Sequence, residues 1–366
     1  MYQVNWKYKP LLFTIDIIGY ILFSPYWVFK KRIKENEIKK ILVIRIDEIG
    51  DVLLTTPVLR ALRKRFPDAG IDVLIKNDTK ELLDDNPNID KLILCEQPWL
   101  KKSINLFYYI SLIRKLRKEK FDLAIEIHPD ARNIFLGFFS ARYVIGHKFR
   151  GLGFLLDKAT NSNPCKEHII QLNLDVVRLI GADSNDELDI DYGKKNLQKA
   201  KSLIKIAKGK IICINPGAGR ANKLWLNDKW AKLADALIEK YKAQIIFVGS
   251  YEEQGLIKDI QSYMKNKDQS INMAGKTTLL DLAALIKMCK LLIATDSGPL
   301  HIARAVKTPL IGLYGTVDPK IWGYNDKYSR IVCKASKFDE NRGKVMMDLI
   351  QVEDVLREVK DLWQKI

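Results

Sequence analysis

The sequence has few of the residues that build disulfide frameworks or metal centres. It contains five cysteines among 366 residues, and no two of them form a CxxC pair. An odd number of scattered cysteines argues against a disulfide framework and against structural zinc, and it indicates a reducing compartment. The four histidines also never stand at metal-ligand spacing. These counts argue against a structural metal site. We expect no cofactor.

Signature motifs of two large classes are also missing. The chain has no GxxxxGK[ST] segment, so it lacks the loop of P-loop nucleotide-binding proteins. It has no helix-turn-helix, RNP or zinc-finger pattern, although its formal net charge of +17 fits an anionic partner. A membrane surface or a phosphorylated substrate is therefore a better candidate partner than a nucleic acid. The plain alternative is a solvated, lysine-rich surface.

The longest apolar run lies at the N-terminus. Residues 11–29 carry a single charge, Asp16, and cations stand on both sides of the run: Lys7, Lys9, Lys30, Lys31, Arg32 and Lys34. No small-x-small cleavage site follows, so a removable signal peptide is the less favoured interpretation. Asp16 and Pro25 favour a helix in the membrane interface over a spanning one. We predict that residues 1–40 associate with a membrane; a helix packed on the domain is the alternative.

After residue 40, β-branched apolar runs alternate with helical periodicity, which predicts parallel sheets covered by helices. The expected strands are 41–46, 71–75, 91–95, 121–127, 141–146, 211–217, 244–250, 291–298 and 309–315. The expected helices are 51–66, 79–85, 103–119, 168–180, 227–241, 252–264, 279–288, 299–306 and 352–365. The polar stretch 181–196 marks a boundary. We therefore predict an α/β fold with two Rossmann-like domains, 41–190 and 191–366, that face each other across a cleft.

An acidic turn follows the first of these strands. It holds Asp47, Glu48 and Asp51 and a single glycine, Gly50, whereas a phosphate-binding turn would be basic and rich in glycine. A carboxylate here can serve as a general base, or it can stabilise the start of the next helix. We favour Asp51 as the base because it directly follows Gly50, where the backbone can turn sharply.

Two stretches of the C-terminal half could bind phosphate. In residues 214–230, Gly217 and Gly219 allow a ligand to approach the backbone, and Lys223 can neutralise its charge. The alternative is an ordinary loop with surface cations.

In residues 294–315, a strand end and a helix start supply Asp296, Ser297 and Gly298, an arrangement suited to an anion. His301 could add a donor; alternatively, Ser297 is only a helix cap and His301 a packed side chain. Glu252 and Glu253, just after a strand, offer a carboxylate that could bind ribose hydroxyls or only favour a helix dipole.

The segment 101–120 combines aromatic side chains with a dense set of cations. Arg114, Lys115 and Arg117 are candidate contacts for anionic lipid or a lipid-linked acceptor. A solvated helix face is an equally good interpretation.

Three segments, taken together and in this order, resemble glycosyltransferase family 9, the heptosyltransferase family of lipopolysaccharide core synthesis. They are IRIDEIGDVLLTTPVLRALRKRFP, INPGAGRANKLWLNDKW and TDSGPLHIARAVKTPLIGLYG. The segments FDLAIEIHPDARN and ARYVIGH look like the middle of that family, so the resemblance covers about residues 41 to 350.

The resemblance implies a GT-B fold, inversion at the anomeric carbon and no metal requirement. It places Asp51 as general base, Lys223 on the donor phosphate, Ser297 with Gly298 at the diphosphate, and Glu252 at the ribose. In one departure, Ala218 and Gly219 stand where heptosyltransferases often carry hydroxyl residues before the lysine.

These observations together predict an inverting glycosyltransferase. It would move heptose or a related sugar from a nucleotide-diphosphate donor to a hydroxyl of a lipopolysaccharide core or other cell-envelope glycan. Residues 41–190 would bind the acceptor and residues 191–366 the donor, at the cytoplasmic face of the membrane. The expected partners are the donor, a lipid-linked or lipopolysaccharide-type acceptor and an anionic membrane surface, with no nucleic acid. A non-catalytic sugar-nucleotide-binding protein on the same fold is the alternative, and a basic nucleic-acid-binding protein is a weaker one.

Overall fold

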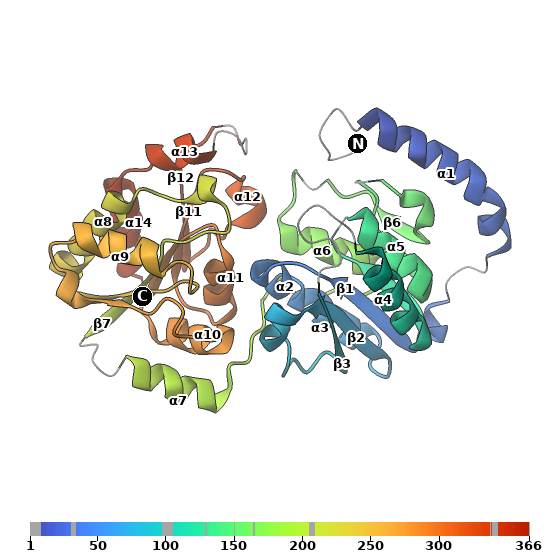
Figure 1. Cartoon of the computed structure of the whole chain (residues 1–366), viewed down its shortest axis with the longest axis horizontal. Helices are drawn as coiled ribbons and strands as arrows, with labels where there is room; N and C mark the ends of the chain where they lie inside the picture. The colour runs from blue at the N-terminus through green and yellow to red at the C-terminus, as the bar shows by residue number, and fades with distance from the viewer. Residues whose placement is uncertain are drawn as a thin grey trace. The chain divides into compact units, whose positions relative to one another are not determined.

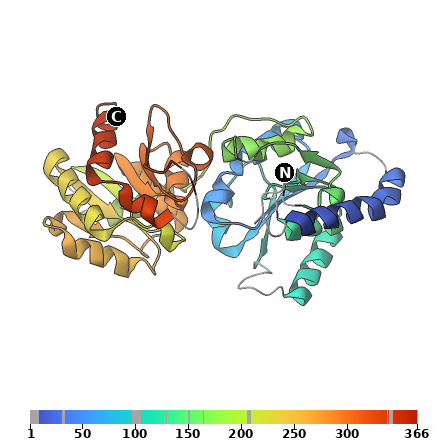
Figure 2. The ribbon, with the colours of Figure 1, turned by 90° about the horizontal axis from the view of Figure 1, so that it is seen from above.

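The structure is a computed structural model that describes residues 9–30, 34–96, 105–128, 130–149, 151–163, 165–204, 209–336, 338 and 343–365. The candidate cations Lys7, Lys31 and Arg32 and the start of the basic segment, 101–104, lie outside these residues. The chain divides into two compact units, Met1–Glu187 and Leu188–Ile366, called unit 1 and unit 2 below. Each unit is built around one sheet with helices on both of its faces (Figures 1 and 2).

Unit 1 contains a six-stranded parallel sheet in the order β3-β2-β1-β4-β5-β6. The strands are β1 (Lys40–Arg45), β2 (Gly70–Lys76), β3 (Lys91–Cys95), β4 (Phe121–Glu126), β5 (Ala141–His147) and β6 (Lys158–Thr160). Their order reverses between β1 and β4, which is where ligands bind in doubly wound sheets. The register pairs Ile44 with Glu126, so the carboxyl ends of these two strands are neighbours.

The helices of unit 1 follow the sequence prediction only in part, because the helix over 131–140 was not predicted and residues 77–82 form a 3₁₀ turn where a helix was expected over 79–85. The helices are α1 (Lys9–Phe29), α2 (Ile49–Leu53), α3 (Thr56–Arg65), α4 (Leu106–Lys118), α5 (Ala131–Ser140) and α6 (Ile169–Arg178), with short 3₁₀ turns that include η3 (Asn77–Leu82) and η5 (Gly153–Leu155). The single helix expected over 51–66 is in fact α2 and α3. Pro57 has no N–H to donate to the Leu53 carbonyl, and the Thr56 hydroxyl donates to it instead at 2.8 Å.

Unit 2 repeats the same plan, in the order β12-β11-β10-β7-β8-β9. Its strands are β7 (Lys210–Asn215), β8 (Ala243–Phe247), β9 (Ser270–Asn272), β10 (Leu291–Thr295), β11 (Leu310–Tyr314) and β12 (Ser329–Cys333). All pair in parallel, and the order reverses between β7 and β10, where Asn215 is in register with Ala294.

The helices of unit 2 bury a core of apolar side chains that includes Trp225 and Trp230. They are α7 (Gly193–Leu203), α8 (Asn227–Tyr241), α9 (Gln254–Tyr263), α10 (Leu279–Met288), α11 (Gly298–Ala305), α12 (Pro319–Trp322), α13 (Gly343–Leu349) and α14 (Val352–Trp363), with the 3₁₀ turn η6 (Ala221–Lys223).

The predicted N-terminal hydrophobic helix is present as α1, which lies along the periphery of unit 1 (Figures 1 and 2). Its residues Pro10–Phe29 are long and apolar enough to cross a membrane, and only 11% of the most apolar window is buried.

Candidate active site

Each unit places polar side chains at its own strand reversal. In unit 1 they follow β1 and β4, and in unit 2 they follow β7 and β10. Because parallel strands present their carboxyl ends at one edge of the sheet, these residues meet although they are far apart in the sequence.

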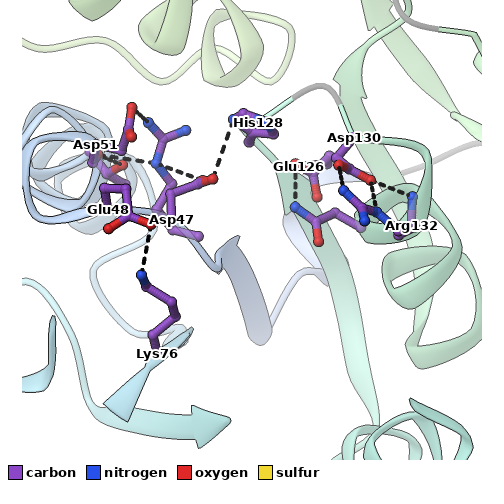
Figure 3. Close-up of polar contacts among 11 residues, drawn as sticks. Asp47, Glu48, Asp51, Lys76, Glu126, His128, Asp130 and Arg132 are labelled. Atoms are coloured by element: carbon purple, nitrogen blue, oxygen red, sulfur yellow. Dashed lines mark hydrogen bonds and ion pairs between the residues drawn. The ribbon is translucent and has the colours of Figure 1, made fainter. Parts of the chain in front are cut away.

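Asp51 lies in the first turn of α2, but its carboxylate does not cap that helix. Arg45, at the end of β1, donates from Nη2 to Asp51 Oδ1 at 3.1 Å and from Nε to the Asp51 carbonyl at 3.0 Å (Figure 3). The Arg45 side chain is 2% exposed, whereas that of Asp51 is 25% exposed. A buried cation therefore orients a carboxylate that solvent or a substrate can still reach.

Asp47 is the least exposed acid of the turn, with 13% of its side chain exposed. Its Oδ2 lies 3.4 Å from Arg45 Nε, and its Oδ1 lies 3.4 Å from His128 Nδ1 (Figure 3). Burial raises the pKa of Asp47, and the Arg45 charge counteracts part of that rise. Glu48 points away to solvent, 78% exposed, and pairs with Lys76 at 3.0 Å. Of the two acids that Arg45 contacts, Asp51 is the more exposed, at 25% against 13% for Asp47.

The carboxyl end of β4 adds a second acidic group that the sequence did not single out. Glu126 is fully buried, and its nearest described donor is Asn133 Nδ2 at 3.4 Å. Burial and the negative charge of Asp47 raise its pKa well above the ordinary value. Asp130 is also largely buried, but the hydrogen bonds from Arg132 outweigh burial and lower its pKa. Neighbouring carboxyl groups therefore have pKa values shifted in opposite directions.

In unit 2, Lys223 and Asp296 join the two stretches expected to bind phosphate. Lys223 Nζ, at the end of η6, lies 2.5 Å from Asp296 Oδ2, just after β10. The side chains are 21% and 10% exposed. This pair places a cation beside the start of α11, where free N–H groups favour an anion.

The Ser297 hydroxyl belongs to a network that links three strand ends. It donates towards Asn215 Oδ1 at 2.9 Å and the Thr295 carbonyl at 3.0 Å, and no side-chain cap bond on α11 is present. Thr295 donates to the Gly217 carbonyl at 2.5 Å, and Asn215 Nδ2 donates to the Val248 carbonyl at 3.0 Å. The network fixes the loop that carries Gly217, while a Cβ on Gly219 would meet no atom within 4 Å.

The structure separates the two adjacent acids after β8. Glu252 is exposed, and hydrogen bonds from its own backbone N–H and from Ser250 lower its pKa. Glu253 instead accepts from Ser250 N at 2.7 Å, and its carboxylate lies against Gly217 and Gly249. Only Glu253 therefore reaches the edge of the sheet where β7 and β8 end.

His301, one turn into α11, is 5% exposed. Its Nδ1 lies 2.7 Å from the hydroxyl of Tyr324, which packs against it edge to face. The structure thus gives His301 a packed position, one turn after Ser297.

The loop with Lys223 rests on the end of the chain. Trp225 Nε1 donates to the Ile350 carbonyl at 3.0 Å, and Lys229 Nζ donates to the same carbonyl at 2.7 Å. Lys344 of α13 donates to the Leu224 carbonyl at 3.1 Å. Residues more than a hundred positions away therefore hold η6 in place.

The candidate acceptor cations of α4 lie apart from these clusters. Arg114, Lys115 and Arg117 are all exposed, on the side of α4 away from the buried Leu112 and Leu116. The structure gives them no contact with the acidic turn.

The family follows from the sequence as a whole. The model of glycosyltransferase family 9 (heptosyltransferase) matches residues 109–347. This chain belongs to glycosyltransferase family 9. It is therefore a glycosyltransferase, as the sequence motifs predicted.

Relatives of known function agree with this family. The chain is 29% identical over 330 residues to lipopolysaccharide heptosyltransferase 3 of Escherichia coli K12, covering 86% of this chain and 95% of the relative. It is 30% identical over 297 residues to lipooligosaccharide heptosyltransferase 2 of Haemophilus influenzae, covering 76% and 84%.

Solved structures share the fold. A family 9 glycosyltransferase from Veillonella parvula matches with a TM-score of 0.80 at 24% identity, over 92% of this chain and 99% of that one. The E. coli ADP-heptose heptosyltransferase II matches with a TM-score of 0.72 at 23% identity, over 89% and 99%. These likenesses confirm the predicted GT-B class for this family 9 chain.

The sequence analysis missed Arg45 and Glu126 as candidate site residues, and of the two acids after β8 it chose Glu252 over Glu253. The signal for Arg45 was present, because a cation at the end of a buried strand requires a carboxylate nearby and Asp47 and Asp51 follow it. For metal ions, the described residues offer no group of three or more His, Cys, Asp or Glu side chains that could act as ligands.

Proposed function

We propose that this family 9 enzyme transfers heptose, or a closely related sugar, from an ADP-linked donor to a hydroxyl of a lipopolysaccharide core, with inversion. The donor and acceptor classes come from relatives named as lipopolysaccharide heptosyltransferases and from one named for ADP-heptose. The reaction takes place at the cytoplasmic face of the membrane, where unit 1 binds the acceptor and unit 2 the donor.

The proposed chemistry divides between the two clusters. The acceptor O–H gives its proton to the Asp51 carboxylate as its oxygen attacks the anomeric carbon. The bond from that carbon to the diphosphate breaks on the opposite face, and ADP leaves with the electron pair. Lys223, the N–H groups at the start of α11 and the Ser297 region stabilise the charge on the departing diphosphate.

The observation that carries the base assignment is the contact between Arg45 and Asp51. A helix-start acid would cap α2 or face its free N–H groups, whereas this carboxylate accepts from a buried arginine of the preceding strand. For the ribose we propose Glu253 in place of Glu252, because its carboxylate lies over Gly217 and Gly249.

The decisive experiment is a transfer assay with purified protein, ADP-heptose and a core acceptor that lacks its terminal heptose. We expect release of one ADP per acceptor modified and a product of opposite anomeric configuration to the donor. Donor binding without any transfer to a set of truncated cores would favour a non-catalytic sugar-nucleotide-binding protein. If the protein instead transfers sugar from a different nucleotide sugar, the proposed reaction class stands and only the proposed donor is wrong.

A further inference from the structure

The helix α1 is attached to unit 1 by polar contacts along one face. Asp16, only 7% exposed, accepts from the Leu152 backbone N–H at 2.7 Å. Eleven residues later, Trp27 donates from Nε1 to the Phe154 carbonyl at 2.9 Å. A charged residue within the apolar run thus serves to hold the helix on the protein.

The attachment continues to the end of the helix. Lys30 Nζ lies 2.9 Å from Asp157 Oδ2, with side chains 12% and 8% exposed. Between these contacts, Gly19 packs so closely that a Cβ would lie 2.3 Å from the Phe154 ring. From Asp16 to Lys30 the attached face is about 21 Å long at 1.5 Å per residue.

The rest of α1 is exposed and apolar. Its six most exposed large apolar side chains are Leu11, Phe13, Ile21, Leu22, Val28 and Phe29, all more than half exposed. An apolar surface of this kind on a soluble unit marks an interaction site. The exposed hydroxyls of Thr14 and Ser24 donate to carbonyls of the helix itself, and none of the exposed side chains described in Pro10–Phe29 is charged.

The apolar surface continues from α1 onto α5. The Tyr26 ring lies 5.9 Å from that of Phe138, which lies 5.3 Å from Phe139. Phe139 is 45% exposed, and it stacks on the partly exposed Phe135 at 6.2 Å. Two helices from different parts of the sequence therefore form one apolar patch.

A basic hollow of about 430 Å³ adjoins this patch. Phe138 and Phe139 line one part of it, and the cations Arg117, Lys120 and Arg142 line another. Asp122 also lines the hollow, and its carboxylate accepts hydrogen bonds from the backbone N–H groups of Lys39 and Lys40 at 2.9 and 3.0 Å. Cations beside exposed rings suit the boundary between anionic headgroups and acyl chains.

We propose that α1 lies in the plane of a lipid leaflet that contains anionic phospholipid, with the basic hollow taking a headgroup. The inference rests on the membrane-side function proposed above and specifies how the enzyme is held there. A spanning α1 would have to leave unit 1, which would expose the Phe154 site and bring Asp16 into hydrocarbon without its partner. An in-plane helix keeps all three polar attachments while its outward face enters the lipid.

The test is flotation of the full chain with vesicles of neutral lipid and of neutral lipid mixed with anionic phosphatidylglycerol. We expect binding to the mixed vesicles, and its loss in the Ile18→Asp/Leu22→Asp variant, whose positions are exposed and tolerate charge without unfolding. Tyr263→Asp, at an exposed aromatic of unit 2, is the matched control and should bind like the wild type. Arg117→Gln/Arg142→Gln should weaken binding to anionic vesicles by about fivefold per cation removed and leave binding to neutral ones unchanged.

The mode of binding is tested by alkaline carbonate extraction of the native membranes. Release of the protein is expected for an in-plane helix, and retention would overturn that placement. Failure of the wild type to float would also overturn the proposal. So would a lipid-free dimer that the double Asp variant converts to monomers, because the apolar face would then bind a second copy of the chain.

ADP binding is measured on the same preparations. If the protein does not float but still binds ADP and transfers sugar, only the proposal of membrane docking is refuted. Flotation without transfer to any core acceptor refutes only the proposed function.

Discussion

Unit 1 and unit 2 have the same strand order but opposite chemistry where that order reverses. At the reversal of unit 1, several carboxylates surround one buried cation, Arg45. At the reversal of unit 2, glycines and hydroxyls accompany one ion pair, between Lys223 and Asp296. In unit 1 a single buried cation therefore orients the carboxylates, whereas in unit 2 a cation and a carboxylate hold each other.

The comparison shows what the fold supplies and what it leaves to the side chains. The parallel sheet brings two strand ends together in both units, and this geometry alone selects no chemistry. We propose that the strand end followed by acids accepts a proton, whereas the one followed by glycines and a lysine binds an anion. Substitutions that remove or exchange these charges test the comparison directly.

The largest effect is expected for Asp51→Asn. Asparagine keeps the shape and can still accept from Arg45, but it cannot take the acceptor proton. Transfer should fall at least about a hundredfold, while the melting temperature and ADP affinity stay unchanged. Glu48→Gln, at the exposed acid of the same turn, is the matched control and should retain nearly full activity. Near wild-type transfer by Asp51→Asn would show that Asp51 is not the proton acceptor.

The next effect is expected for Lys223→Ala, which removes the cation of unit 2. Loss of one charge-assisted contact should weaken ADP binding, measured by calorimetry, by about 1–3 kcal/mol. The double variant Lys223→Ala/Asp296→Asn removes the carboxylate left without its partner, so it should regain stability but not affinity. Lys232→Ala, an exposed lysine of the same unit, should bind ADP normally. Full recovery of affinity in the double variant would make the pair purely structural.

A smaller effect is expected for Arg45→Lys, which tests whether the buried cation positions Asp51. A single ammonium keeps the charge but cannot bond both the carboxylate and the carbonyl of Asp51 as the guanidinium does. We expect kcat to fall about tenfold, the scale of one lost hydrogen bond to a charged group, with KM for the donor unchanged. Arg63→Lys, at a partly exposed ion pair of α3, is the control. If kcat falls only as far as the loss of stability accounts for, Arg45 has a structural role alone.

The smallest effect concerns pH and the buried Glu126. Because its folded-state pKa is raised, Glu126 stays protonated in the folded protein at pH values where the unfolded chain has released the proton. This group therefore lowers stability as pH rises above about 4.3, the value of an unperturbed glutamate. Glu126→Gln should remove that component, so the difference in Tm between the variant and the wild type should grow with pH. A difference independent of pH would show that Glu126 is ionised in the folded state.

Much of the fold could be predicted because local patterns and tertiary packing agree. The helices at 227–241 and 279–288 begin and end as expected, and the second has a capping box between Thr278 and Asp281. Helix 51–66 was wrong as one element because Pro57 interrupts it. The edge strands β6, β9 and β12 and the helices α5 and α7 were not predicted. For β6 and β9 the reason is length, because three residues, KAT and SIN, are too few to show alternation.

The candidate site was harder to predict because its partners come from distant strands. The turn with Asp51 was visible, but its contact with Arg45 depends on a side chain that folds back from the preceding strand. Glu252 and Glu253 differ only in direction, which the local backbone after β8 decides. Glu126 looks like part of an ordinary strand, and only the register of β4 beside β1 places it near Asp47.

The dependence of Lys223 on the end of the chain has a consequence for synthesis. Unit 1 is complete at residue 187, and with α1 attached it can fold while the ribosome is still translating. The loop with Lys223 emerges soon afterwards, but the Ile350 carbonyl that holds Trp225 and Lys229 is made more than a hundred residues later. We expect the nascent enzyme to bind the membrane before it can bind a nucleotide. A ribosome stalled before residue 350 would then carry a membrane-bound chain that cannot bind the donor.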